Sequence, residues 1–191
     1  MKVLVACEFS GRVRDAFGER GHDAWSCDFE ASETPGQHIQ GDVRLILDHG
    51  WDMMIAHPPC TRLCNSGVRW LLERRLFQEM DIACSFFKLL LDCHIPKVAI
   101  ENPVMHAYAR LGIGGLKPDF TIQPWQFGDA QTKRTCFWTR NLPPLRPEVN
   151  IKPDSCRADV HREGPSSLRA RNRSRTFPGI AKAMATQWGE L

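Results

Sequence analysis

Several features that would place this chain of 191 residues in a special class are absent from it. No apolar run approaches the roughly 18 residues of a membrane span, and no apolar leader precedes the first predicted strand. The net charge of +3 is too small to indicate a nucleic-acid-binding protein by itself. The sequence also has no internal repeat. We therefore expect a globular protein of the cytoplasm with no membrane partner.

A disulfide framework is also not expected, although the chain has eight cysteines. In a reducing cytoplasm these thiols stay free. His57, Cys60 and Cys64 have the spacing of one half of a zinc site, but no matching second half lies nearby. We therefore predict no structural metal.

Short apolar runs alternate with helical stretches in the first half, which is typical of a parallel sheet with crossover connections. A long helix is predicted over residues 67–93, where apolar residues recur at three- and four-residue spacing. We predict one α/β domain over residues 1–191, with a doubly wound, mostly parallel sheet in a core of residues 1–140. An irregular Arg- and Pro-rich segment (141–179) and a terminal helix (180–188) follow. The predicted strands are residues 2–7, 22–27, 38–43, 51–56 and 97–100, with a hairpin of 121–127 and 135–140; shorter helical stretches are 13–20 and 44–49.

Side chains that could take part in catalysis or ligand binding follow five predicted strands, each at its carboxyl end. In a doubly wound sheet these ends share one edge, where ligands bind. The residues could therefore line a single cleft. They are Phe9, Ser10 and Gly11 after the first strand, Asp28 and Glu30 after the second, Asp42 after the third, Cys60 after the fourth, and Glu101 and Asn102 after the fifth.

Cys60 follows two prolines, which makes its loop stiff and aims the thiol at this edge. A thiolate can add to an electron-poor ring if an acid protonates the ring. Glu101 could be that acid, provided that burial raises its pKa. The alternatives are a packing thiol for Cys60 and a helix N-terminal acid for Glu101.

Asp28 follows Gly11 at about the spacing of a glycine turn and an acid that binds ribose hydroxyls. A glycine in the first turn of an α/β protein is as often needed for close packing. The pair indicates a nucleotide-like cofactor only weakly.

Positive charge is concentrated in one stretch near the C-terminus, offset only by Asp159 and Glu163. Guanidinium groups bind phosphate well, so the stretch could contact a nucleic-acid backbone. The alternative is a solvated surface segment. The basic residues are Arg157, Arg162, Arg169, Arg171, Arg173 and Arg175.

From Val3 to about Arg140 the motifs resemble those of the cytosine-5 methyltransferase family. Pro58-Pro59-Cys60 is similar to the nucleophile motif of that family, and Glu101-Asn102-Pro103 to its Glu-Asn-Val triplet. The weaker similarities are Phe9-Ser10-Gly11 to the first cofactor motif, Asp28 or Glu30 to the ribose-binding acid, Asp42 to the residue that contacts adenine, and Gln131-Thr132-Lys133-Arg134 to the Gln-Arg-rich segment.

The resemblance implies a Rossmann-like fold, S-adenosylmethionine as cofactor, and methylation of carbon 5 of cytosine in DNA. Cys60 would attack carbon 6 of the ring while Glu101 stabilises the protonated nitrogen 3. The other implied catalytic residues are Asn102 and Arg134; the cofactor-binding set is Phe9, Ser10, Gly11, Asp28, Glu30, Asp42 and Pro58; the phosphate-binding set is Arg62, Lys133, Arg169, Arg171, Arg173 and Arg175.

The chain also departs from the family pattern. Arg12, Val13 and Arg14 stand where further glycines are usual, and His57 stands in place of a glycine. Family members usually carry a large target-recognition region between the Gln-Arg-rich segment and the terminal helix. Here only about 40 residues separate the two. Two alternatives therefore stay open. One is the same chemistry on a free cytosine nucleotide such as dCMP, and the other is a non-catalytic protein that binds nucleotide or nucleic acid.

Overall fold

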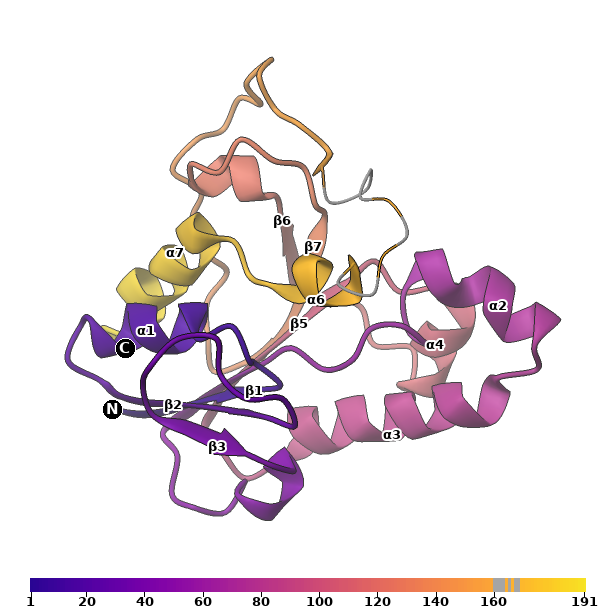
Figure 1. Ribbon diagram of the computed structural model, residues 1–191, viewed down its shortest axis with the longest axis horizontal. Coiled ribbons are helices and arrows are strands. Elements are labelled where there is room, and N and C mark those ends of the chain that lie inside the picture. The colour runs from indigo at the N-terminus through magenta and orange to yellow at the C-terminus, as the bar shows by residue number, and fades with distance from the viewer. Residues whose placement is uncertain (160–163, 165, 167–168) are drawn as a thin grey trace.

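A mixed seven-stranded sheet forms the centre of the protein in a computed structural model that describes residues 1–159, 164, 166 and 169–191 (Figure 1). The strand order is β3-β2-β1-β4-β5-β7-β6. The first five strands are parallel, while β7 is antiparallel to both β5 and β6. This confirms the predicted α/β class. The bounds are β1 Lys2–Ala6, β2 Asp23–Asp28, β3 His38–Gln40, β4 Met53–Ala56, β5 Lys97–Pro103, β6 Phe120–Ile122 and β7 Thr135–Arg140.

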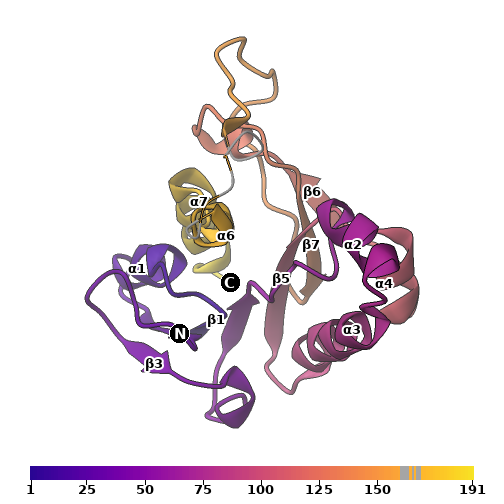
Figure 2. The ribbon, with the colours of Figure 1, turned by 45° about the vertical axis from the view of Figure 1, so that its right-hand side comes forward.

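Alternation along β1 explains why helices cover both faces of the sheet. Val3 and Val5 point into one apolar layer, and Leu4 and Ala6 point into the other. Figure 2 shows α1 and α7 together on one side and α2, α3 and α4 on the other. The helices are α1 Arg12–Gly18, α2 Val68–Glu73, α3 Phe77–Asp92, α4 Ala107–Gly112, α6 Arg169–Ser174 and α7 Pro178–Trp188, with 3₁₀ turns η1 Val43–Leu45, η2 Asn65–Gly67 and η3 Pro124–Phe127.

The prediction of a single helix over residues 67–93 is wrong, because the helical conformation is interrupted between α2 and α3. Arg75 has a φ of +53°, which no residue adopts inside a right-handed helix. The apolar spacing continues through the break because Leu71 and Met80 both enter the same layer. Periodicity alone therefore does not reveal the interruption.

Other predicted bounds also change. The strand predicted over 121–127 ends at Ile122, because Pro124 starts η3 and cannot donate to a strand ladder. β5 runs on to Pro103 because it pairs with β7. The helices α4 and α6 are not predicted from the sequence. Among the described residues, no helix is long and apolar enough to cross a membrane.

Candidate active site

The ends of β1, β4 and β5 lie side by side at the carboxyl edge of the sheet. In the register, Ala56 of β4 is opposite both Ala6 and Ile100. The first residue after β4, His57, donates its N–H to the Ala6 carbonyl at 2.9 Å and lies beside Glu101. The Cys60 loop, residues 57–64, therefore starts next to the carboxylate that the sequence predicts as its partner.

Backbone hydrogen bonds hold the Cys60 loop in place. The N–H of Cys64 donates to the Cys60 carbonyl at 2.9 Å, which closes a tight turn around the thiol. The N–H of Asn65 donates to the Val104 carbonyl at 3.0 Å. Because Val104 follows β5, the loop is tied to the same strand that carries Glu101. The two chemical groups are thus held on one rigid frame.

Cys60 and Cys64 form a hydrogen-bonded pair of thiols. The bond with Cys64 and burial raise the pKa of Cys60; the charge of Glu101 adds to this, while Lys133 opposes it. The same bond lowers the pKa of Cys64, whose Sγ also lies 3.0 Å from the hydroxyl of Ser66. The interaction therefore favours the proton on Cys60 and the negative charge on Cys64.

Glu101 is a buried carboxylate between two basic side chains. Its Oε2 lies 2.9 Å from His57 Nδ1, and its Oε1 lies 3.9 Å from Lys133 Nζ. Burial would raise the pKa of Glu101, but the charge of Lys133 and the hydrogen bond from His57 outweigh burial and lower the pKa to about 2. The prediction of an acid with a raised pKa is therefore wrong, and Glu101 is ionised at neutral pH.

Three further residues predicted for the site take different positions. Lys133, expected at a phosphate, is only 12% exposed, and its Nζ donates to the Arg173 carbonyl at 3.1 Å. Asn102 is buried; its Nδ2 donates to the Pro103 carbonyl at 2.7 Å, and its Oδ1 has no partner among the described residues. Arg134 is exposed, and among the described residues it forms no ion pair with Glu101. The largely buried cation next to Glu101 is therefore Lys133.

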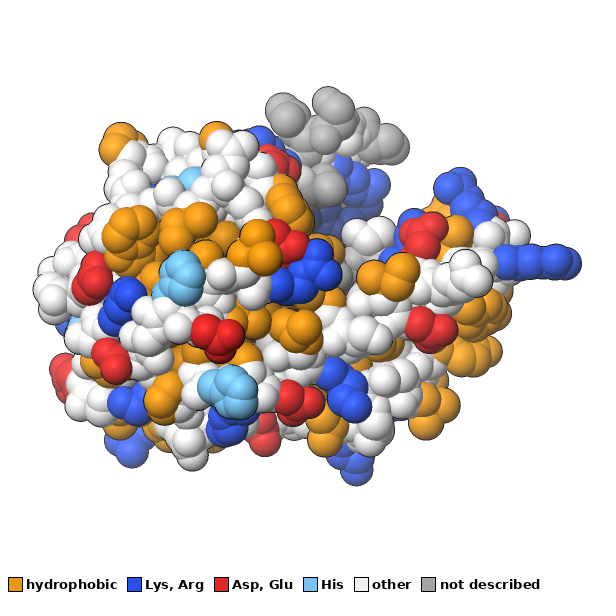
Figure 3. Space-filling view, turned by 90° about the horizontal axis from the view of Figure 1, so that it is seen from below, with side chains coloured by type: hydrophobic (Ala, Val, Ile, Leu, Met, Phe, Trp, Pro, Cys, Tyr) orange, Lys and Arg blue, Asp and Glu red, His pale blue; other side chains and the backbone are white. Residues whose placement is uncertain are grey.

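A cavity of about 620 Å³ lies between the ends of β2 and β3 and the helix α3. Asp28 and Asp42 both line it, together with the apolar side chains of Phe29, Pro59 and Phe86. Burial raises the pKa of Asp28. Figure 3 views the molecule from this side, where hydrophobic and charged side chains are mixed. A cavity with apolar walls and two carboxylates suits a ligand that has a flat ring and hydroxyl groups.

Other residues predicted to bind a cofactor do not line this cavity; they are Phe9, Ser10, Gly11, Glu30 and Pro58. Glu30 forms an ion pair with Arg171. The ring of Phe9 lies under the same guanidinium, 4.6 Å from its centroid to the guanidinium carbon. Of the two acids predicted for ribose, Asp28 is therefore the one at the cavity.

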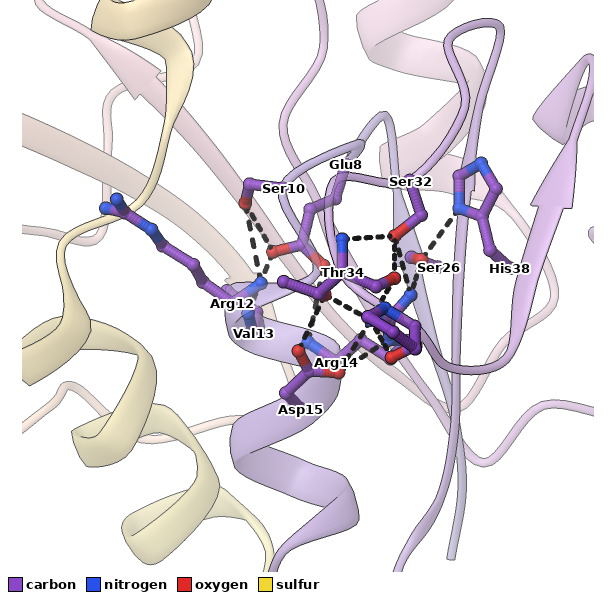
Figure 4. A network of polar contacts seen from close by, with 11 residues as sticks. Glu8, Ser10, Arg12, Val13, Arg14, Asp15, Ser26, Ser32, Thr34 and His38 are labelled. Atoms are coloured by element: carbon purple, nitrogen blue, oxygen red, sulfur yellow. Dashed lines mark hydrogen bonds and ion pairs between the residues drawn. The ribbon is translucent and has the colours of Figure 1, made fainter.

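Glu8, a residue that the sequence does not reveal, caps the first helix (Figure 4). Its Oε1 accepts the N–H of Val13 at 2.8 Å, and its Oε2 accepts the N–H of Arg14 at 3.3 Å. The Ser10 hydroxyl donates to the same carboxylate at 3.2 Å. These N–H groups bind pyrophosphate in dinucleotide folds. Here a protein carboxylate occupies them, so the turn does not suit a phosphate.

The buried guanidinium of Arg14 fixes residues 32–35 against this turn (Figure 4). It donates to the hydroxyls of Ser26, Ser32 and Thr34 at 3.2, 3.0 and 2.6 Å. A Cβ at Gly11 would lie 2.2 Å from the Thr34 hydroxyl, and φ there is +73°, so this position requires glycine. A polar network therefore stands where further glycines were expected.

The Arg-rich segment contacts acids of the protein itself. Arg171 pairs with Glu30 and Glu33, and Arg175 pairs with Glu33. Arg62, also predicted at a phosphate, pairs with Glu79. These guanidinium groups have internal partners because acids lie within reach.

The remaining predicted arginines are less informative. Arg169 and Arg173 lie in α6 and are partly exposed, while Arg157 pairs with Asp159. Arg162 lies outside the described residues. In the described part of the chain, no group of three or more His, Cys, Asp or Glu side chains is placed to bind a metal ion.

Comparisons with known proteins give distant structural neighbours only. No protein-family model and no curated protein matches the chain. A DNA modification methyltransferase encoded within a prophage of E. coli matches 72% of this chain at 15% identity and a TM-score of 0.46. The Entamoeba histolytica methyltransferase EhMeth matches 78% at 15% identity and a TM-score of 0.47. The chain spans about half the length of both, 45% and 55%.

Proposed function

We propose that the protein is an S-adenosylmethionine-dependent methyltransferase that acts on carbon 5 of cytosine in DNA. The main support is that the loop of Cys60 and the carboxylate of Glu101 are tied to one frame at the ends of β4 and β5. Pro59 of the same loop lines the cavity, so a cofactor and a target base would meet at Cys60. A sulfur nucleophile next to a carboxylate suits reversible addition to a cytosine ring.

Each polar group of the site has a role in this chemistry. Cys60 adds to carbon 6 of the ring, and its sulfur leaves again when the carbon 5 proton is lost. Glu101 binds the nitrogen 3 edge and accepts from the exocyclic amine. Lys133 holds a positive charge near Glu101, which compensates the buried carboxylate. Catalysis thus depends on a charge arrangement that exists before the base arrives.

The residues around the cavity fit the proposed cofactor. Asp28 would accept ribose hydroxyls, Asp42 would accept the adenine amine, and Phe29 and Phe86 would contact the ring. Because Glu8 occupies the N–H groups of α1, the turn suits a cofactor without phosphate. S-adenosylmethionine, when bound, supplies an electrophilic methyl group.

The DNA would need to present its cytosine out of the base stack, at a cost of a few kcal/mol in a duplex and less in a single strand. Since Arg171 and Arg175 are paired with acids, other cations must contact the backbone. Arg74 and Arg75 are exposed next to α2, which follows the Cys60 loop. They are our candidates for phosphate contacts.

The test offers methyl-labelled S-adenosylmethionine together with double-stranded DNA, single-stranded DNA or dCMP. We expect label in DNA, and we expect Cys60→Ser to lower transfer by more than about 1,000-fold because it removes the nucleophile. An oligonucleotide with 5-fluorocytosine should trap a covalent adduct with the unmodified protein. The matched control is Cys93→Ser, which alters another half-buried thiol away from the site.

The outcomes distinguish methylation of DNA from methylation of a free nucleotide and from non-catalytic binding. Transfer to dCMP alone would overturn DNA as substrate while keeping the chemistry. Methylation that survives Cys60→Ser would overturn the nucleophile. Absence of both transfer and calorimetric cofactor binding would leave a non-catalytic binding protein.

A further inference from the structure

His57 occupies a position from which it controls the carboxylate of the site. It is the first residue after β4, and its side chain is 7% exposed. Its Nδ1 lies 2.9 Å from Glu101 Oε2, whereas Lys133 Nζ, at 3.9 Å from the other oxygen, is beyond hydrogen-bond distance. Among the described residues, His57 is therefore the one side chain hydrogen-bonded to Glu101.

The charge of Glu101 poses a chemical difficulty. An ionised carboxylate has acceptors only and cannot donate to nitrogen 3 of cytosine. Addition of a thiolate to carbon 6 places negative charge on the ring, and this charge must be neutralised by a proton. The groups around Glu101 are His57, Lys133, and the thiols of Cys60 and of Cys136 in β7. The thiols are weak acids, and Lys133 is not in contact.

We propose that His57 is a positioning residue that holds Glu101 through Nδ1 and carries the proton that Glu101 passes to the target base. This inference rests on the proposed function. The side chain is one of the few that can hold a proton at neutral pH and release it. Its other nitrogen, Nε2, is buried and has no hydrogen-bond partner among the described residues, so the bond to Glu101 is the one hydrogen bond of the ring there.

The step balances in atoms and charge. The Cys60 thiol gives its proton to the Cys64 thiolate, and the Cys60 sulfur lone pair forms the bond to carbon 6. The carbon 5–carbon 6 π electrons become the carbon 4–carbon 5 bond, and the carbon 4–nitrogen 3 π electrons become a lone pair on nitrogen 3. The proton leaves Nδ1 of the His57 imidazolium, passes through Glu101 Oε2, and ends on nitrogen 3. After methylation of carbon 5, a water molecule takes the carbon 5 proton, the electrons of that bond re-form the carbon 5–carbon 6 double bond, and the carbon 6–sulfur pair leaves on Cys60. The nitrogen 3 proton then returns to His57 by the same path.

The experiment follows adduct formation between the full-length protein and an oligonucleotide with 5-fluorocytosine. His57→Asn keeps a hydrogen-bond donor near Glu101 but cannot carry an extra proton. We expect it to slow adduct formation about 100-fold, the usual contribution of a general acid, with a smaller change in the KM for DNA. His94→Asn, at an exposed histidine, is the control and should leave the rate unchanged.

A second variant separates a proton carrier from a packing group. His57→Gly leaves space for a small ring, and added imidazole should restore the rate of adduct formation. 1,2,4-Triazole has the same shape but is not protonated at neutral pH, so it should not restore the rate. Equal rescue by both rings, or a wild-type rate for His57→Asn, would overturn the role of His57. If the unmodified protein forms no Cys60 adduct, the proposed function itself fails, which is a distinguishable result.

Discussion

Cys64 lies one turn after Cys60, and the two thiols share a hydrogen bond that divides their acidities. Because the bond with Cys60, the Ser66 hydroxyl and the backbone N–H groups of Ser66 and Gly67 stabilise the Cys64 thiolate, its pKa lies below that of an ordinary thiol. The pKa of Cys60 lies above it. Within the pair, Cys60 is therefore the weaker acid, and Cys64 is a proton acceptor next to it.

This arrangement predicts the effect of Cys64→Ser on thiol titration. The unmodified pair should show one thiolate below the usual thiol pKa and one above it. Cys64→Ser should abolish the acidic step, while burial and Glu101 keep the remaining Cys60 pKa raised. Thiolate absorbance against pH measures both steps, and Cys93→Ser serves as the control. An acidic step that persists in Cys64→Ser would contradict the assignment.

The residues of the site differ in how well the sequence reveals them. Cys60 and Glu101 could be brought together because parallel strands end at the same edge of a sheet. The hydrogen bond from His57 depends on the register of β4 against β5, which the sequence does not specify. Glu8 acts through two backbone N–H groups, and an acid two residues before a serine-glycine turn is the only signal it leaves.

At the scale of elements, α6 is held over Phe9 by ion pairs to Glu33. Hydrogen bonds from Arg175 and Arg171 lower the pKa of Glu33 to about 2 although burial raises it. The folded pKa lies below the unfolded one, so this stabilisation is complete above about pH 4.5. It is lost as the pH falls from there through about 2.

Glu33→Gln should therefore loosen α6 at neutral pH. We expect amide hydrogen exchange in residues 169–174 to accelerate about two- to fivefold, which corresponds to a largely exposed ion pair of up to about 1 kcal/mol. Glu19→Gln, at an exposed acid of the same type, should not change this exchange. Unchanged exchange in Glu33→Gln would show that other contacts hold the helix.

The elements themselves could be predicted where one physical rule dominates. The buried strands β1, β2 and β4 follow from apolar runs that both layers require. The break at Arg75 and the start of η3 at Pro124 were missed, because apolar periodicity continues across the first and the apolar residues of 121–127 resemble a strand. The helix α6 depends on distant acids at Glu30 and Glu33, so its own sequence could not predict it.

At the scale of the whole molecule, α7 joins the end of the chain to the sheet hairpin. Trp188 is fully buried, and its ring contacts Phe137 of β7 edge-on, with 6.1 Å between centroids. Its indole N–H donates to the Pro143 carbonyl at 2.9 Å. One side chain thus connects the terminal helix, the strand that follows Lys133, and the segment after that strand.

Trp188→Ala should lower the free energy of unfolding by about 3–5 kcal/mol, the usual cost of removing a buried tryptophan. Leu191→Ala, at a half-exposed side chain, should change it by no more than about 0.5 kcal/mol. Urea titration followed by circular dichroism measures both. Glu101 lies opposite Phe137 in the β5–β7 ladder and is hydrogen-bonded to His57, and neither interaction uses the Trp188 side chain. The folded fraction of Trp188→Ala should therefore still form the Cys60 adduct at a rate close to that of the wild-type protein. A loss of adduct formation without a loss of stability would show instead that α7 sets the position of Lys133 through β7.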